Sequence, residues 1–172
     1  MAEKKETDWS FLQLLALAVV LDIVFKQFSL LTAIQPILPI AVLAGILYGA
    51  SRGIAVGLFA AVASGLLFDS AIYFTGALFF VQAISAIIAG ALGGAIAQTK
   101  KPSTIEFAGL TVIAVIVFEA LNNFLQGTAY SRLSGYYYLE GTALASALHI
   151  IAAVLLAILL SSLLKQGKDE KS

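Results

Sequence analysis

Apolar residues run in long blocks along the chain, and short polar stretches separate these blocks. A helix needs about 20 mostly apolar residues to cross the hydrocarbon core of a bilayer, because that core is about 30 Å thick and each helical residue rises 1.5 Å. Blocks of about this length therefore indicate membrane-spanning helices. The sequence predicts six spans: Phe11–Leu31, Ile34–Ala50, Gly53–Asp69, Ala77–Ala97, Ile105–Gln126 and Thr142–Leu164.

The fold class expected from this pattern is an all-α polytopic membrane protein. Only Ser51 and Arg52 separate the second block from the third, which predicts a tight helical hairpin. The connections are too short to hold another domain, so residues 11–164 form one six-helix membrane domain. Residues 1–10 and 165–172 are expected to be tails at its two ends.

The distribution of lysine and arginine predicts how the six helices are oriented. Cytoplasmic loops of membrane proteins carry an excess of these residues. If the N-terminus is cytoplasmic, the outer side carries only Lys26 and Arg132. The inner side then carries eight basic residues: Lys4, Lys5, Arg52, Lys100, Lys101, Lys165, Lys168 and Lys171. We therefore expect a multi-pass protein of the plasma (inner) membrane with both termini in the cytoplasm.

The overall composition supports a membrane protein and excludes several functions. The 172 residues are 60% hydrophobic and 12% charged, with a mean hydropathy of +0.98, whereas soluble domains are nearer 45–50% apolar and about 25% charged. Ten basic and ten acidic residues cancel, so the chain lacks the basic surface that nucleic acid requires. With no cysteine and one histidine, we expect no metal site and no cofactor. No hydrolase or nucleotide-binding motif is present, and the prediction is a non-enzyme.

Small residues recur at four-residue spacing in the third and fourth predicted helices. Four residues advance nearly one helical turn, so each set forms a smooth stripe along which another backbone can approach closely. Such stripes serve either packing within the bundle, which is their commoner role, or docking of a partner subunit. The candidate docking residues are Gly53, Gly57, Ala61 and Gly65 in the third helix and Gly90 and Gly94 in the fourth.

Polar residues inside the apolar blocks are a second candidate site, because each of them is costly to place in lipid. Glu119, Asn122, Asn123 and Gln126 share one face of the fifth helix. In the predicted orientation, these and the other polar residues of the apolar blocks lie in the outer halves of their helices. This distribution argues against a polar path across the whole membrane. The complete outer cluster is Asp22, Lys26, Asp69, Gln82, Glu119, Asn122, Asn123, Gln126, Arg132 and His149.

Two parts of this cluster are the pair Asp22 and Lys26 and the single histidine, His149. Asp22 and Lys26 are spaced i, i+4, which permits an ion pair. His149 shares a helix face with Ser146, and a single histidine is more often a hydrogen-bonded structural residue than a ligand or a base.

The chain resembles the rod shape-determining protein MreD family of bacterial cell-wall elongation components. The resemblance rests on Pro36, the turn Arg52–Gly53, the stretch GLLFD at Gly65–Asp69, Gly76, Glu119 in the fifth helix, and His149 ahead of Ala152 and Ala153. It implies a non-catalytic scaffold that binds an MreC-like protein and organises the cell-wall synthases, in concert with the MreB cytoskeleton. The small-residue stripes would then be docking faces, with Asp69 and Glu119 as family-like positions.

Two alternatives remain open. The size, the helix number, the orientation and the hairpin of the second and third helices are also similar to the substrate-binding S component of an energy-coupling factor vitamin transporter. That resemblance implies a transmembrane T component and ATPases as partners, with the outer cluster holding the vitamin beneath Tyr130, Arg132 and Tyr136–Tyr138. The other alternative is a bundle whose polar residues serve only to hold the helices together.

Overall fold

The computed structural model describes residues 3–27, 35–68, 77–100, 102–130 and 146–161, and throughout these ranges the regular structure is helical. The all-α fold class is confirmed for this part of the chain. The helices are α1 (Glu3–Gln27), α2 (Ile37–Tyr48), α3 (Ala50–Phe68), α5 (Ala77–Thr99), α6 (Thr104–Tyr130) and a last helix, Ser146–Ser161.

Three of the described helices are long and apolar enough to cross a membrane. The qualifying segments are Ala50–Leu67, Phe79–Thr99 and Thr104–Asn122, which correspond to the third, fourth and fifth predicted spans. The first predicted span falls in the 25-residue α1 as far as Gln27. The last helix, with residues 146–161, is shorter than the predicted sixth span.

The predicted span Ile34–Ala50 contains a much shorter helix. With 12 residues, α2 is about 18 Å long, well below the thickness of the hydrocarbon core. It ends at Gly49, whose φ of +93° is readily adopted only by glycine. Ser51 and Arg52, expected to connect two helices, instead form the first turn of α3. The charge of Arg52 suggested a connection between two helices. A long arginine side chain can instead belong to the end of a helix and extend its charged group toward water.

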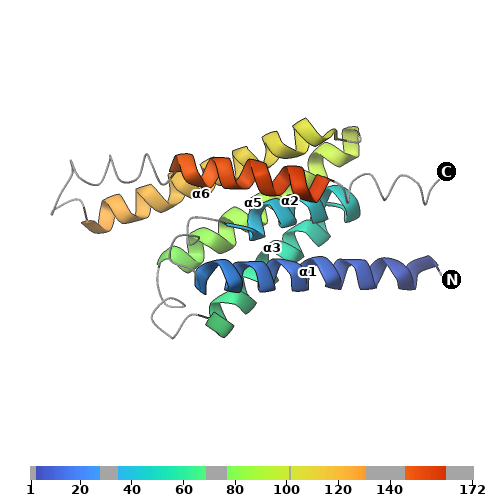
Figure 1. Ribbon diagram of the computed structural model, residues 1–172, viewed down its shortest axis with the longest axis horizontal. Coiled ribbons are helices and arrows are strands. Elements are labelled where there is room, and N and C mark those ends of the chain that lie inside the picture. Colours follow the sequence, from blue (N-terminus) through green and yellow to red (C-terminus); the bar gives the residue numbers. More distant parts are fainter. Residues whose placement is uncertain (1–2, 28–34, 69–76, 101, 131–145, 162–172) are drawn as a thin grey trace.

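The helices form a bundle in which neighbours in the chain run in opposite directions (Figure 1). The C-terminal ends of α1, α3 and α6 lie at the same end of the bundle as the N-terminal ends of α5 and the last helix. Contacts between α3 and α5 follow this order, since Gly53 lies against Gly90 whereas Gly57 lies against Ala86. The start of α1 and the end of the last helix consequently lie at the opposite end.

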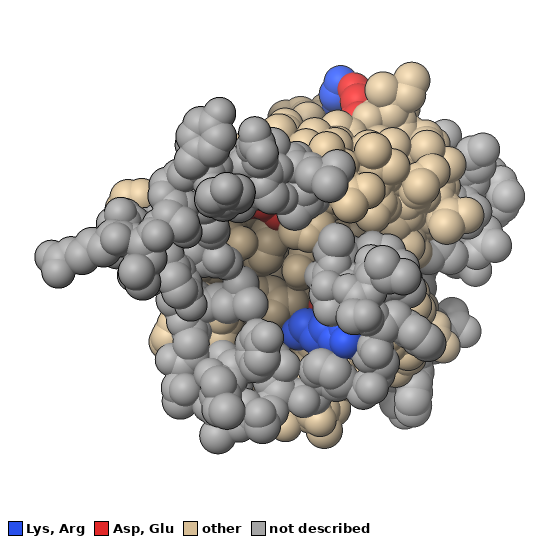
Figure 2. Space-filling view, turned by 60° about the vertical axis from the view of Figure 1, so that its left-hand side comes forward, with Lys and Arg blue, Asp and Glu red and all other residues tan. Residues whose placement is uncertain are grey.

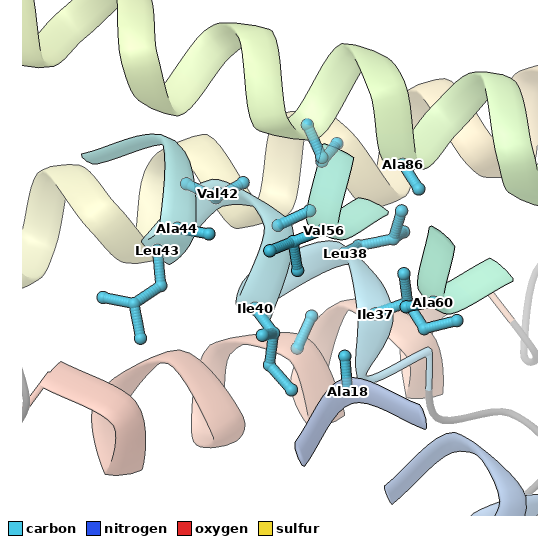
Figure 3. Packing of buried hydrophobic residues seen from close by; sticks show 14 of the residues in the cluster. Ala18, Ile37, Leu38, Ile40, Val42, Leu43, Ala44, Val56, Ala60 and Ala86 are labelled. Atoms are coloured by element: carbon cyan, nitrogen blue, oxygen red, sulfur yellow. The ribbon is translucent and has the colours of Figure 1, made fainter. Parts of the chain in front are cut away.

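The short helix α2 occupies the centre of this bundle. It contacts α1, α3, α5 and α6, and its residues Ile37–Gly45 are all buried (Figure 3). Side chains of the surrounding helices, among them Ala18, Val56 and Ala86, pack against it. A 12-residue apolar helix is typical of a buried core element, and the enclosed position of α2 matches its uniformly apolar sequence.

Glycines allow α2, α3 and α5 to pack backbone against backbone. A Cβ atom added to Gly53 would lie 2.6 Å from the Cα of Gly45 and 2.7 Å from the carbonyl oxygen of Gly90. A Cβ at Gly45 would lie 2.7 Å from the backbone nitrogen of Gly94. Any larger residue at these positions would push the helices apart. Such close approach increases van der Waals contact, which drives helix association in membranes.

Candidate functional site: the polar end of the bundle

Buried polar side chains gather at one end of the bundle, which we call the polar end. Asp22 lies late in α1, Ser64 late in α3 and Gln82 early in α5, and the directions of these helices bring the three positions to the same end (Figure 1). Glu119 in the second half of α6 and His149 at the start of the last helix lie toward that end as well. These five residues therefore lie toward one end of the bundle.

The first group at this end is the Asp22 centre, formed by Asp22, Lys26, Ser64, Gln82 and Gln35. Asp22 is 1% exposed, and its Oδ2 lies 2.8 Å from the Nζ of Lys26. The hydroxyl of Ser64 donates to Asp22, and Lys26 donates to the Ser64 Oγ at 3.3 Å. The ion pair that the i, i+4 spacing permits is thus formed, and a serine of α3 completes it.

Gln82 extends the Asp22 centre to two further elements. Its Nε2 lies 3.4 Å from Oδ1 of Asp22 and 3.4 Å from Oε1 of Gln35, which stands just before α2. The centre thereby joins α1, α3, α5 and the start of α2. Sequence reasoning missed Gln35 and Ser64. Both are polar residues within apolar blocks, so the criterion that found Gln82 applies equally to them.

The second group is the Glu119 centre, formed by Glu119, Ser146 and His149. Ser146 Oγ donates to Oε2 of Glu119 at 2.8 Å, and the Nδ1 of His149 contacts Oε1 of the same carboxylate. The ring of Phe118 packs edge-on against the imidazole, with 6.2 Å between ring centres. Both Glu119 and His149 are about 10% exposed. This centre joins α6 to the last helix and belongs to a different pair of helices from the Asp22 centre.

Neither arrangement positions a nucleophile for attack. A serine hydrolase requires the serine hydroxyl to bond to the imidazole that removes its proton. Here Ser146 donates to the carboxylate instead, and His149 contacts that same carboxylate. Asp22 is held by an ammonium and by a hydroxyl, which stabilise its charge. Within the described ranges, no three potential ligands among histidine, cysteine, aspartate and glutamate converge to hold a metal ion.

The remaining members of the predicted outer cluster are only partly described. Asn122 lies in α6, one turn beyond Glu119, and is half-buried. Asn123 and Gln126 belong to the same helix, but their side chains lie outside the description. Asp69 and Arg132 are outside the described residues altogether. The described part of the cluster thus consists of two hydrogen-bonded centres and Asn122.

The small-residue stripes lie inside the bundle. Gly53 and Gly57 of α3 face α5, where a Cβ at Gly57 would lie 2.8 Å from the carbonyl carbon of Ala86. Gly90 and Gly94 of α5 face Gly53 and Ala50 in return. Two further residues of the stripe, Ala61 and Gly65, are buried too. The stripes named as candidate docking faces are therefore covered by helices of the chain itself, and this leaves no free surface there for a partner.

One buried hydroxyl lies close to the Asp22 centre in the sequence. Ser85 is fully buried one turn beyond Gln82 in α5, and its Oγ has no hydrogen-bond partner. A buried polar atom without a partner is uncommon and costs about 1–3 kcal/mol.

Ser85 and Ser64 form a matched pair for measuring what these hydroxyls contribute. Both are helical serines with 0% exposure, but only Ser64 bonds to charged groups. We expect Ser85→Ala to raise the free energy of unfolding by about 1 kcal/mol, and Ser64→Ala to lower it by about 1.5–3 kcal/mol. Thermal unfolding of the two variants in detergent measures both. Equal shifts of the same sign would contradict the difference in bonding.

Outside the two centres, charge is sparse on the surface visible at this end. In Figure 2 most of the described surface is uncharged: one group of basic atoms lies in a central hollow, and another protrudes at the top beside acidic atoms. Large apolar side chains on the outside include Phe59 and Leu67 of α3 and Leu159 of the last helix, each more than half exposed. Such an exterior suits contact with lipid.

Comparison with known proteins gives no relative: no protein-family model, no curated protein and no solved structure matches this chain.

Proposed function

We propose that the chain is a non-catalytic scaffold of the plasma (inner) membrane, of the kind that the resemblance to MreD implies. In this proposal the chain passes through the membrane six times, with the short α2 enclosed by the other helices. Both termini lie in the cytoplasm, and the polar end faces outward. It binds an MreC-like protein and thereby helps to organise the enzymes that extend the cell wall.

The observation that carries the proposal is the position of the motif-like segment, Pro36 to Gly94. Its described helices, α2, α3 and α5, are the ones that pack backbone against backbone at the centre of the bundle. Pro36 immediately precedes α2, and Gly53 touches both neighbouring helices. Pro36, Gly53 and Gly65, on which the resemblance partly rests, thus have structural roles in this packing. A closely packed central unit suits a protein whose task is to position others.

A partner of this scaffold must dock outside the glycine stripes, which are covered. Within the motif GLLFD, Gly65 is buried whereas Leu66 and Leu67 are 63% and 72% exposed. These two leucines combine membership of the motif with an outward position near the polar end. We therefore assign the partner contact to the outer face of α3 around Leu66 and Leu67.

Affinity capture from native membranes tests this assignment. The tagged chain, solubilised in mild detergent, is expected to recover an MreC-like protein and cell-wall synthases, identified by mass spectrometry. Leu67→Ala should lower that recovery about fivefold or more. Leu159→Ala, which shortens an equally exposed leucine (71%) on the last helix, should leave it unchanged. Loss of recovery in both variants, or in neither, would contradict the assigned face.

A second candidate function is favoured by the Asp22 centre. Two amides, a hydroxyl and an ion pair from four elements meet at one end of the bundle. The S component of a vitamin transporter would need polar groups at such a position to hold its substrate. Capture of a T component with a pair of ATPases would favour this function over the scaffold.

A ligand measurement distinguishes the second candidate further. If the polar end holds a small molecule, native mass spectrometry of the purified chain should detect it, and Gln82→Leu should abolish it. Gln13→Leu alters an exposed glutamine of α1 outside the centre and serves as the control. A chain that carries no small molecule after purification, yet recovers cell-wall synthases, would exclude the transporter function.

A further inference from the structure

The contact between Gln82 and Gln35 leaves half of each side-chain amide unused. A carboxylate can only accept hydrogen bonds, so the group of Gln82 that faces Asp22 must be its amide nitrogen, Nε2. The same Nε2 lies 3.4 Å from Gln35, which therefore presents its carbonyl oxygen, Oε1. Gln82 keeps its Oε1 as an acceptor, and Gln35 keeps its Nε2 as a donor. The carboxylate of Asp22 thus fixes the orientation of both amides.

These two remaining groups, Oε1 of Gln82 and Nε2 of Gln35, have no hydrogen-bond partner among the described residues. Polar groups that are largely removed from water usually have such a partner. Gln82 is 7% exposed, yet neither its Oε1 nor the Nε2 of Gln35 is completely enclosed. The space-filling view shows a hollow at the polar end (Figure 2). Both groups therefore retain some access from outside the bundle.

The two groups are close enough together for one small molecule to bind both. Each belongs to an amide whose other atom takes part in the 3.4 Å contact between the two side chains. Oε1 of Gln82 requires a donor, and Nε2 of Gln35 requires an acceptor. A carboxylate offers no donor, and an ammonium offers no acceptor. An amide-type group, in which an N–H stands next to a C=O, offers both at once.

We propose that Gln82 and Gln35 bind the amide-type edge of a small molecule, as found in a lactam, a ureido group or a pyrimidine ring. The inference rests on the second candidate function, in which the polar end holds a small molecule. Glutamine side chains make paired hydrogen bonds of this kind with the edge of a nucleobase. Asp22 is a positioning residue of this site, because it acts on the ligand only through the amide of Gln82.

Uracil is the probe for this site, because its ring carries N–H groups next to carbonyl groups. Dimethyluracil, methylated on both ring nitrogens, keeps the ring and the carbonyl groups but cannot donate to Oε1 of Gln82. Isothermal titration calorimetry of the full chain in lipid nanodiscs measures the binding of each compound. We expect uracil to bind saturably and dimethyluracil to bind at least about tenfold more weakly, since it leaves the acceptor without a donor. This comparison requires no variant.

Gln35→Glu tests the donor of the proposed site. The glutamate keeps an oxygen that accepts from Gln82 but has a second acceptor in place of Nε2, so uracil binding should fall about tenfold or more. Gln98→Glu makes the same change at an exposed glutamine at the other end of α5 and should leave uracil binding unchanged.

The proposal is overturned if uracil does not bind, or if the two pyrimidines bind equally well. Failure of the second candidate function has a different signature, since that function is tested by recovery of a T component, ATPases and a bound small molecule with the chain. If these are recovered and the two pyrimidines still bind equally, the transporter function stands and the glutamine site does not.

Discussion

Gly90→Ala is expected to lower the free energy of unfolding by about 3 kcal/mol or more, the upper end of the range for an overfilled core. A Cβ at this position would lie closer than 3.0 Å to the backbone of Gly53 and to the nitrogen of Ile54. Backbone atoms cannot move aside as the end of a flexible side chain can. A single methyl group must therefore separate α3 from α5, and that separation also disturbs α2.

Gly109→Ala is the matched control for this substitution. Gly109 is also inside a long helix, α6, but beyond its chain neighbours and the backbone of its own helix a Cβ there would meet no atom within 4 Å. The same change should stabilise the protein by about 0.5–1 kcal/mol, because alanine loses less backbone freedom than glycine in a helix. Thermal unfolding in detergent measures both variants. Similar melting temperatures for the two would show that α3 and α5 do not pack as closely as described.

The second large effect is expected at the ion pair of the Asp22 centre. Removing one partner of a buried pair typically costs about 3–5 kcal/mol, because the remaining charge is left uncompensated. We expect Lys26→Met to be more destabilising than Asp22→Asn. Lys26 is 19% exposed and can extend toward water once its partner is neutral, whereas Asp22 is 1% exposed and cannot. The two substitutions are expected to differ because Asp22 is more deeply buried than Lys26, although both remove the same ion pair.

A double-mutant cycle measures the interaction within this pair. In Asp22→Asn with Lys26→Met, no uncompensated charge remains, so the loss of stability should be smaller than the sum of the two single losses. The free energy of unfolding of all four chains is measured under the same detergent conditions. Additive losses would show that the two charges do not interact, in contradiction to the 2.8 Å contact.

Much of the fold could be predicted from the apolar blocks alone. Their lengths correctly predicted the helices at Ala50–Leu67, Phe79–Thr99 and Thr104–Asn122, because a helix in lipid must satisfy all its backbone hydrogen bonds internally. The block at Ile34–Ala50 suggested a membrane-spanning helix, but it contains the 12-residue helix α2. Block length does not distinguish a helix that crosses lipid from a short helix enclosed by other helices. α2 ends at Gly49 because this residue has a positive φ. The sequence alone does not show which glycine of an apolar block adopts such a φ.

The sequence allowed us to predict which polar residues belong to the candidate sites, but not which of them contact one another across helices. Asp22 and Lys26 could be paired because they share one helix, and helical spacing is known in advance. The contact of Ser64 with Asp22 joins residues 42 positions apart, and that of His149 with Glu119 joins residues 30 apart. Such contacts depend on which helices are neighbours. The same limit applied to the glycine stripes, whose spacing fits an internal interface and an external one equally well.

The single-residue connection at Gly49 makes α2 and α3 one structural unit. An extended residue covers at most about 3.6 Å, so a connection of one residue keeps the end of α2 beside the start of α3. With Gly49 alone between them, α2 and α3 form one hairpin that cannot be separated into two independent helices. The glycines Gly45 and Gly53 on either side of the turn let the two helices meet at once.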